Sequence, residues 1–246
     1  GLGKRRWRIG APCSSETPLL PHGDLRLLAD FEASDEWVLE PGDILYVPPC
    51  VPHDGVAVGD DCMTYSVGFR APALAELVEG WAAHQADCMS DDDRYADPEL
   101  VRQANPGEIS ASALDRLYGM ALAALSDRQS FACWFGIHTS TPKYAEADWR
   151  PHEPIDERAV RQDLANRTVL RRNPASRFAF IRQSGQAVQL FVDGLCFDCE
   201  GEMAVLAEAL CAHTALVADP ELARSQRAIA QISALIDQGS LTFGQD

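Results

Sequence analysis

A single histidine, His53, follows a proline-rich corner in residues 39–55, which read LEPGDILYVPPCVPHDG. A carboxylate and a Pro-Gly turn lead into a short apolar strand, and prolines stiffen the corner just before the imidazole. This layout is typical of a small β-barrel that aims an imidazole inward at a metal. One imidazole cannot hold a catalytic metal alone, so a metal site depends on further ligands. The other interpretation is a turn histidine beside proline.

The segment Lys4-Arg5-Arg6-Trp7-Arg8 offers a second kind of chemistry. Iron(II) oxygenases bind their metal through two histidines and one carboxylate and leave the remaining positions open. Their co-substrate 2-oxoglutarate carries a second carboxylate, which a buried arginine can bind in a bidentate manner. Strand alternation puts Arg5 and Trp7 on one face and the other three cations on the opposite face. A solvated edge strand is the alternative interpretation of this run.

Composition limits the classes of function. The chain has 246 residues and a net charge of −16, which argues against non-specific nucleic-acid binding and suits a basic protein partner. No apolar run is long enough for a membrane span, and no signal peptide is recognisable. Eight scattered cysteines indicate reduced, mostly buried thiols, and the lone Cys196-Phe-Asp-Cys199 motif has no second pair to complete a zinc site. We therefore expect a cytoplasmic protein without a membrane partner.

Hydrophobic periodicity predicts an α+β chain with three parts. Strands and turns fill the first 70 residues, three amphipathic helices follow, and a helix–strand–hairpin–helix pattern after a proline-rich linker is typical of a winged helix. Asp193-Gly194 is a strong hairpin turn, while Asp219 and Gly239 are expected to begin and end the last helix. The expected strands are 4–9, 36–40, 44–47, 55–58, 63–69, 177–182, 187–192 and 195–198, and the expected helices include 109–125 and 156–164. Residues 151–246 hold nine arginines, no lysine and thirteen carboxylates, so this winged helix is not expected to bind nucleic acid.

Three segments together resemble a known family. Residues 1–10 (GLGKRRWRIG), residues 39–53 and residues 64–72 (TYSVGFRAP) closely resemble the bacterial ribosomal oxygenases of the JmjC/cupin class. The resemblance implies the C-terminal part of a double-stranded β-helix barrel over residues 1–70. It further implies a helical dimerisation region over 71–146 and a winged-helix-like domain over 147–246.

The resemblance also implies an activity and its residues. Enzymes of this family are Fe(II)- and 2-oxoglutarate-dependent hydroxylases that act on an arginine of a large-subunit ribosomal protein, and their helical segment makes a homodimer. Carried over by position, His53 would be the distal iron ligand, Arg5 would bind the far carboxylate of 2-oxoglutarate, and Ser66 would lie near the metal pocket. No residue is assigned as a catalytic acid or base.

One part of the family pattern is missing from this chain. In the family, the first histidine and the carboxylate form a His-x-Asp pair just before the strand that corresponds to residues 4–8, which we call the arginine strand. This sequence starts at Gly1, directly after the expected position of that pair. We therefore expect an N-terminally truncated member. The segment His22-Gly23-Asp24 matches the His-x-Asp pattern but lies in a Pro/Gly turn after the arginine strand. A surface turn is therefore the better interpretation. Two functions therefore stay open: a hydroxylase that is incomplete and inactive as written, or a non-enzymatic remnant that serves as a dimeric protein-interaction module.

Overall fold

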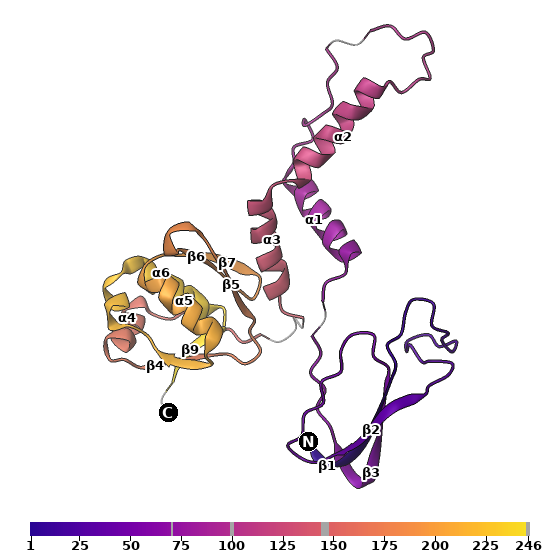
Figure 1. Cartoon of the computed structure of the whole chain (residues 1–246). Helices are drawn as coiled ribbons and strands as arrows, with labels where there is room; N and C mark the ends of the chain where they lie inside the picture. The colour runs from indigo at the N-terminus through magenta and orange to yellow at the C-terminus, as the bar shows by residue number, and fades with distance from the viewer. Residues whose placement is uncertain (70, 99–100, 144–147, 245–246) are drawn as a thin grey trace. The chain divides into compact units, whose positions relative to one another are not determined.

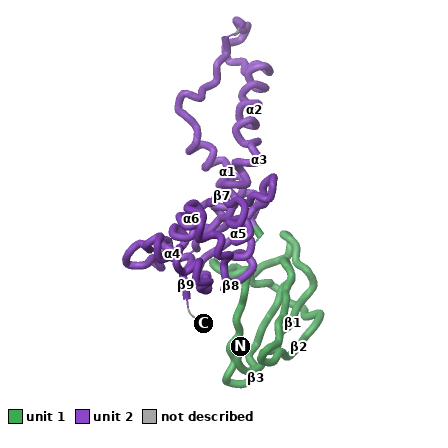
Figure 2. The backbone as a smooth tube through the Cα atoms, turned by 90° about the vertical axis from the view of Figure 1, so that its left-hand side faces the viewer, with its two compact units in different colours: residues 1–71 green, residues 72–246 purple. Residues whose placement is uncertain are grey.

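The chain divides into two compact units, Gly1–Ala71 and Pro72–Asp246, which Figure 2 colours separately. The computed structural model describes residues 1–69, 71–98, 101–143 and 148–244. The predicted limits at residues 70 and 146 fall on residues outside those ranges. The division into three parts therefore stays a prediction.

The first unit is built on one antiparallel sheet of three strands, in the order β2-β1-β3 (Figure 1). β1 at its centre is the arginine strand and pairs with both neighbours over most of its length. Its side chains alternate as expected, since Arg5 and Trp7 are half-buried while Lys4 and Arg6 are exposed. The strands are β1 (Leu2–Gly10), β2 (Ala33–Leu39) and β3 (His53–Met63).

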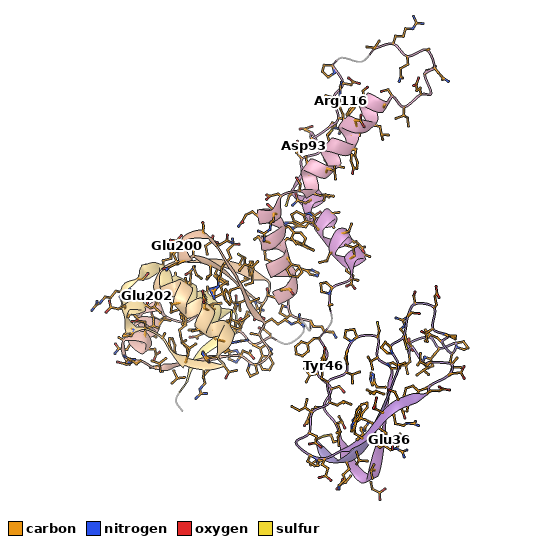
Figure 3. The ribbon with its side chains drawn as sticks, viewed as in Figure 1. Glu36, Tyr46, Asp93, Arg116, Glu200 and Glu202 are labelled. Carbon is orange, nitrogen blue, oxygen red and sulfur yellow. The ribbon has the colours of Figure 1, made fainter. Side chains whose placement is uncertain are left out.

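Two predicted strands of the first unit are wrong. Residues 44–47 and 64–69 form no strand, whereas β3 is longer than predicted and runs from His53 to Met63. Their apolar residues lie in the open, with Ile44 and Phe69 each 94% exposed and Tyr46 (labelled in Figure 3) 77% exposed. A strand needs a neighbour for its main-chain hydrogen bonds, and among the described residues neither segment has one. The apolar residues of both segments are typical of strands, but such a pattern alone does not supply a partner strand.

The second unit begins with three helices, as predicted. α3 packs on the sheet that follows it, and its tryptophan, Trp134, lies in an aromatic cluster with Trp81 of α1 and Phe131. Ser110 and Asp127 cap α2 and α3 through their side chains. The helices are α1 (Leu74–Cys88), α2 (Ala111–Leu125) and α3 (Arg128–Ser140).

The rest of the second unit has the hairpin and helices of a winged helix around one hydrophobic core. Two three-stranded sheets are present, ordered β5-β6-β7 and β8-β4-β9. The core takes its side chains from α4, α5, α6 and the strands between them, with Leu190, Ile229 and Leu235 fully buried. The elements are α4 (Glu157–Ala165), β4 (Val169–Arg172), β5 (Phe178–Arg182), η1 (Ser184–Gln186), β6 (Val188–Val192), β7 (Leu195–Cys199), α5 (Glu202–Ala212), β8 (Ala215–Val217), η2 (Pro220–Arg224), α6 (Gln226–Asp237) and β9 (Leu241–Gly244).

The last predicted helix is in fact two elements. Asp219 caps only the short η2, through the backbone N–H of Glu221, and Ser225 then caps α6 through the backbone N–H of Ala228. The stop at Gly239 is confirmed, since its φ of +84° is one that glycine adopts readily after a helix. The fold class is confirmed as mixed α and β.

Candidate functional site

One face of the first sheet gathers the predicted site residues. In the register of the sheet, Trp7 lies opposite Gly55, and Ile9 lies opposite His53. Because directly opposed residues point to the same side of a sheet, Arg5, Trp7 and His53 share one face. We call this face the Arg5 face.

Trp7 links the two predicted site residues on the Arg5 face. Its ring lies 5.8 Å from the imidazole of His53, and the Arg5 guanidinium lies 5.8 Å from the Trp7 ring, within the range of a cation–π contact. The ring also crosses Gly55, where a Cβ would come within 2.8 Å of it. A glycine is therefore required at position 55 for Trp7 to lie between Arg5 and His53.

Arg5 has unused hydrogen-bonding capacity. Its Nη1 donates to the carbonyl oxygen of Gly55 at 3.3 Å, while its Nε is buried and has no hydrogen-bond partner among the described residues. On the opposite face, by contrast, Lys4 pairs with Glu40 and Arg8 with Asp54. A buried guanidinium N–H without an acceptor is costly, and a bound carboxylate would satisfy it.

His53 is exposed at the first position of β3, and its Nδ1 lies 3.2 Å from the carbonyl oxygen of Val51. A carbonyl can only accept, so this contact makes Nδ1 the protonated nitrogen. The lone pair of Nε2 is then available, which is the usual arrangement of a metal-binding histidine whose other nitrogen is held by the backbone.

A complete metal site is not formed by the residues that the structure describes. No group of three or more His, Cys, Asp or Glu side chains there could hold a metal ion. The His22-Gly23-Asp24 sequence is confirmed as an exposed turn, because His22 Nδ1 accepts the backbone N–H groups of Asp24 and Leu25 at 3.1 and 2.9 Å. The metal-binding role of His53 therefore stays a prediction that depends on further ligands.

The remaining predicted residues lie elsewhere. Ser66 is exposed in the segment that forms no strand, so its place near the pocket stays a prediction. Two histidines that are not predicted site residues, His84 and His138, stack on Trp81 and Trp134 of the helices. Sequence reasoning placed Trp7 on the face of Arg5 but gave neither it nor Gly55 a role. A lone glycine in a strand pattern is a signal of close approach, and it could have pointed to Gly55.

Comparisons with known proteins show which families this chain resembles. The family model described as "JmjC domain" matches residues 1–77, and the one described as "ROXA-like winged helix" matches residues 123–242. The chain is 39% identical over 154 residues to the Ribosomal protein uL16 3-hydroxylase of Escherichia coli, covering 63% of this chain and 40% of that protein. It is 43% identical over 81 residues to a Probable ribosomal oxygenase of Haemophilus influenzae, covering 32% of this chain and 20% of that protein.

The chain is a homologue of the bacterial ribosomal oxygenases.

Solved structures of these oxygenases extend the likeness over the whole chain. A crystal structure of E. coli YcfD superposes with a TM-score of 0.83 at 29% identity, covering 99% of this chain and 64% of that chain. The structure of YcfD with cobalt and 2-oxoglutarate gives a TM-score of 0.81 at 29% identity, covering 100% of this chain and 63% of that one. This chain thus spans less than two thirds of the length of the ribosomal oxygenases it matches.

The winged-helix match begins at residue 123 and so includes α3, in keeping with the packing of α3 on β5, β6 and β7. Within the described residues, no helix combines the length and apolar character needed to cross a membrane.

Proposed function

We propose that this chain is part of an Fe(II)- and 2-oxoglutarate-dependent hydroxylase that acts on an arginine of a large-subunit ribosomal protein. The observation that carries the proposal is the Arg5 face, where a half-buried guanidinium with a buried, unpaired Nε and an imidazole with a free Nε2 lie on either side of Trp7. The comparisons support it, because a relative is named a ribosomal protein hydroxylase and another is described with cobalt and 2-oxoglutarate.

In this proposal each residue has one role. His53 Nε2 is one iron ligand, Arg5 binds the far carboxylate of 2-oxoglutarate, and Ser66 lies near the metal. Bound iron and 2-oxoglutarate would supply the oxygen-activating chemistry, while the protein holds the co-substrate in place. Among the described residues no three His, Cys, Asp or Glu side chains come together as metal ligands, so these residues do not form an iron site by themselves. We accordingly propose that the 246 residues alone have no hydroxylase activity.

The proposed substrate and location follow from charge and from the relatives. An acidic protein of net charge −16 attracts a basic ribosomal protein and repels nucleic acid, so we propose a protein partner and no direct nucleic-acid contact. A ribosomal substrate places the protein in the cytoplasm.

We also propose that the chain forms a homodimer through α2. This helix of fifteen residues is rich in apolar side chains, yet none of its residues is buried. Leu114, Leu117 and Tyr118 are all exposed and recur at the spacing of one helical face. Such a face is stable in water when a second helix covers it, and a second copy of the same chain provides a matching one.

A second function is favoured by two observations. Because the described residues form no group of three metal ligands and α2 exposes an apolar face, the chain could instead be a dimeric protein-interaction module without catalysis. The two functions differ in whether any form of the protein consumes 2-oxoglutarate.

Succinate production separates these two functions. The 246-residue chain and a version extended upstream to the length of its relatives would be incubated with Fe(II), 2-oxoglutarate and a peptide from the arginine-bearing ribosomal protein. We expect succinate from the extended version alone. His53→Ala should abolish that activity, whereas His22→Ala, which alters an exposed turn, should retain it. If the extended version makes no succinate, the interaction module is the better function.

A further inference from the structure

Two cysteines meet beside the corner that leads to His53. The backbone N–H of Cys13 donates to the carbonyl oxygen of Cys50 at 2.7 Å, and Gly10 N–H donates to the carbonyl oxygen of Pro52 at 3.0 Å. The Gly10–Pro52 bond extends the register in which Ile9 lies opposite His53, whereas the Cys13–Cys50 bond is shifted from that register by one residue. The segment after β1 is thus fastened to the corner, with one cysteine on each side.

The separation of the two cysteines fits a disulfide. The 2.7 Å hydrogen bond and standard backbone dimensions place the two Cα atoms no more than about 6.6 Å apart. Disulfides join residues whose Cα atoms are about 4.4–6.8 Å apart. Both thiols are free, with Cys50 exposed and Cys13 half-buried, so oxidants can reach the pair.

The backbone at Cys50 gives an independent reason to look for a function. Its φ is +63°, a left-handed conformation that a residue with a Cβ adopts only at a cost. Glycine would take this position without strain. Cys50 is the third residue of the turn in which Val51 N–H donates to the carbonyl oxygen of Pro48, a turn position that usually holds glycine when φ is positive. A cysteine at such a position, joined by a backbone hydrogen bond to a second cysteine, points to use of the side chain.

We propose that Cys13 and Cys50 are a reversible redox pair that forms an intramolecular disulfide when the protein meets a peroxide. The more exposed Cys50 thiolate attacks one peroxide oxygen, the O–O bond breaks, and the departing hydroxide takes up a proton to become water. Cys50 is then a sulfenic acid. The Cys13 thiol attacks its sulfur, the S–O bond breaks, a second water leaves, and the disulfide forms. Two thiols and one hydrogen peroxide give one disulfide and two waters, and a dithiol reductant reverses the change.

The disulfide would close a loop that contains all of β2 and ends three residues before His53. It would restrain the corner, where Val51 N–H already donates to the carbonyl oxygen of Pro48 at 3.3 Å. Any effect of this restraint on turnover rests on the proposed function. The existence of the disulfide does not, and it can be tested on the chain alone.

Peptide mapping tests the pair directly. The reduced 246-residue chain would be treated at low concentration with hydrogen peroxide, alkylated, and digested with trypsin together with a protease that cleaves before aspartate. The second cleavage separates Cys50 from Cys62, because Asp54 lies between them. We expect one linked product that joins the Cys13 and Cys50 peptides and disappears on treatment with dithiothreitol. Absence of this product, or an equal yield of Cys13 linked to Cys62, would overturn the proposal.

Matched variants and labelling complete the test. Cys50→Ser should slow the loss of the Cys13 thiol at least about tenfold, because the partner thiol is gone. Cys62→Ser, a half-buried cysteine of the same unit, should leave the linked product unchanged. A mixture of nitrogen-15-labelled and unlabelled chains should give no mixed-label product, whereas a mixed product would show that the disulfide joins two chains and would refute an intramolecular pair. Hydrogen exchange at residues 48–53 should slow on oxidation of the wild type and stay unchanged in Cys50→Ser.

Discussion

The indole ring of Trp7 and the imidazole ring of His53 lie 5.8 Å apart at an interplanar angle of 46°, on neighbouring strands of one sheet. Because the Arg5 guanidinium lies on the other side of Trp7, the three side chains form a continuous surface. A co-substrate that bound Arg5 at one end would thus extend along Trp7 toward His53.

Replacing Arg5 by lysine should raise the concentration of 2-oxoglutarate needed for half-maximal activity, in a version extended to the length of the relatives. The loss of a charge-assisted bidentate contact is worth about 1.5–3 kcal/mol, or roughly tenfold or more in affinity. Arg6→Lys changes a neighbouring cation that points to the opposite face, and it should leave the requirement unchanged. Equal effects of the two substitutions would remove Arg5 from the site.

Two helical glycines, Gly136 and Gly119, should respond in opposite ways to alanine. A Cβ at Gly136 in α3 would overlap the ring of the fully buried Phe191, and we expect Gly136→Ala to destabilise the second unit by about 1–3 kcal/mol. A Cβ at Gly119 in α2 meets nothing within 4 Å, so Gly119→Ala should stabilise its helix by about 0.5–1 kcal/mol. Urea unfolding followed by circular dichroism measures both. A neutral Gly136→Ala would mean that α3 does not pack on β6 as described.

A charge on α2 should break the proposed dimer. Leu117→Asp places a carboxylate on the apolar face, and loss of one buried leucine alone costs about 1.5–3 kcal/mol, so the dimer dissociation constant should rise at least about tenfold. Sedimentation equilibrium measures this constant. Leu195→Asp, at a leucine on β7 that is 51% exposed, is the control and should not change it. A wild-type chain that is monomeric at all concentrations would contradict the dimer itself.

The second unit should lose stability at alkaline pH. Burial raises the pKa of Cys199 and of Cys211 from 9.0 to about 11, while in the unfolded chain both thiols titrate near 9. Between these values the unfolded state releases protons that the folded state retains, so the free energy of unfolding falls as the pH rises from 9 to 11. Each thiol contributes at most about 1.4 kcal/mol per pH unit, and the half-buried Cys211 contributes less than the fully buried Cys199.

Urea unfolding between pH 8 and pH 11 measures this dependence. Cys199→Ala should make the fall of the free energy of unfolding with pH less steep. Cys88→Ala, at an exposed cysteine that ends α1, should leave it as in the wild type. An unchanged slope in Cys199→Ala would show that the Cys199 thiol is not the group that couples folding to pH.

Much of the fold was predictable because local signals dominate it. The hairpin of β6 and β7 follows from alternating apolar residues around Asp193-Gly194, and α4 follows from its Asp156 cap. The sheet β8-β4-β9 was missed because its strands have only three or four residues and pair across long stretches of chain. Short strands carry too little periodicity to be recognised, and their pairing depends on packing of the completed core.

The candidate site was predictable in its residues but not in its geometry. The residue types that flank Arg5 and His53, together with the alternation of side chains along β1, were sufficient to identify both as candidate site residues. Their closeness depends on the register of β1 with β3, which brings Trp7 opposite Gly55. Register is set by tertiary contacts, and no local pattern in this sequence specifies it.

The two units differ sharply in how much apolar surface they remove from water. All buried hydrophobic side chains of the described residues lie from Trp81 onward, and Gly10 is the single buried residue described in the first unit. The three-stranded sheet of Gly1–Ala71 buries little apolar surface, so it offsets less of the conformational entropy lost on ordering its chain than the winged helix does. This unit is therefore the less stable of the two, and proteases should cleave it long before they cut the winged helix.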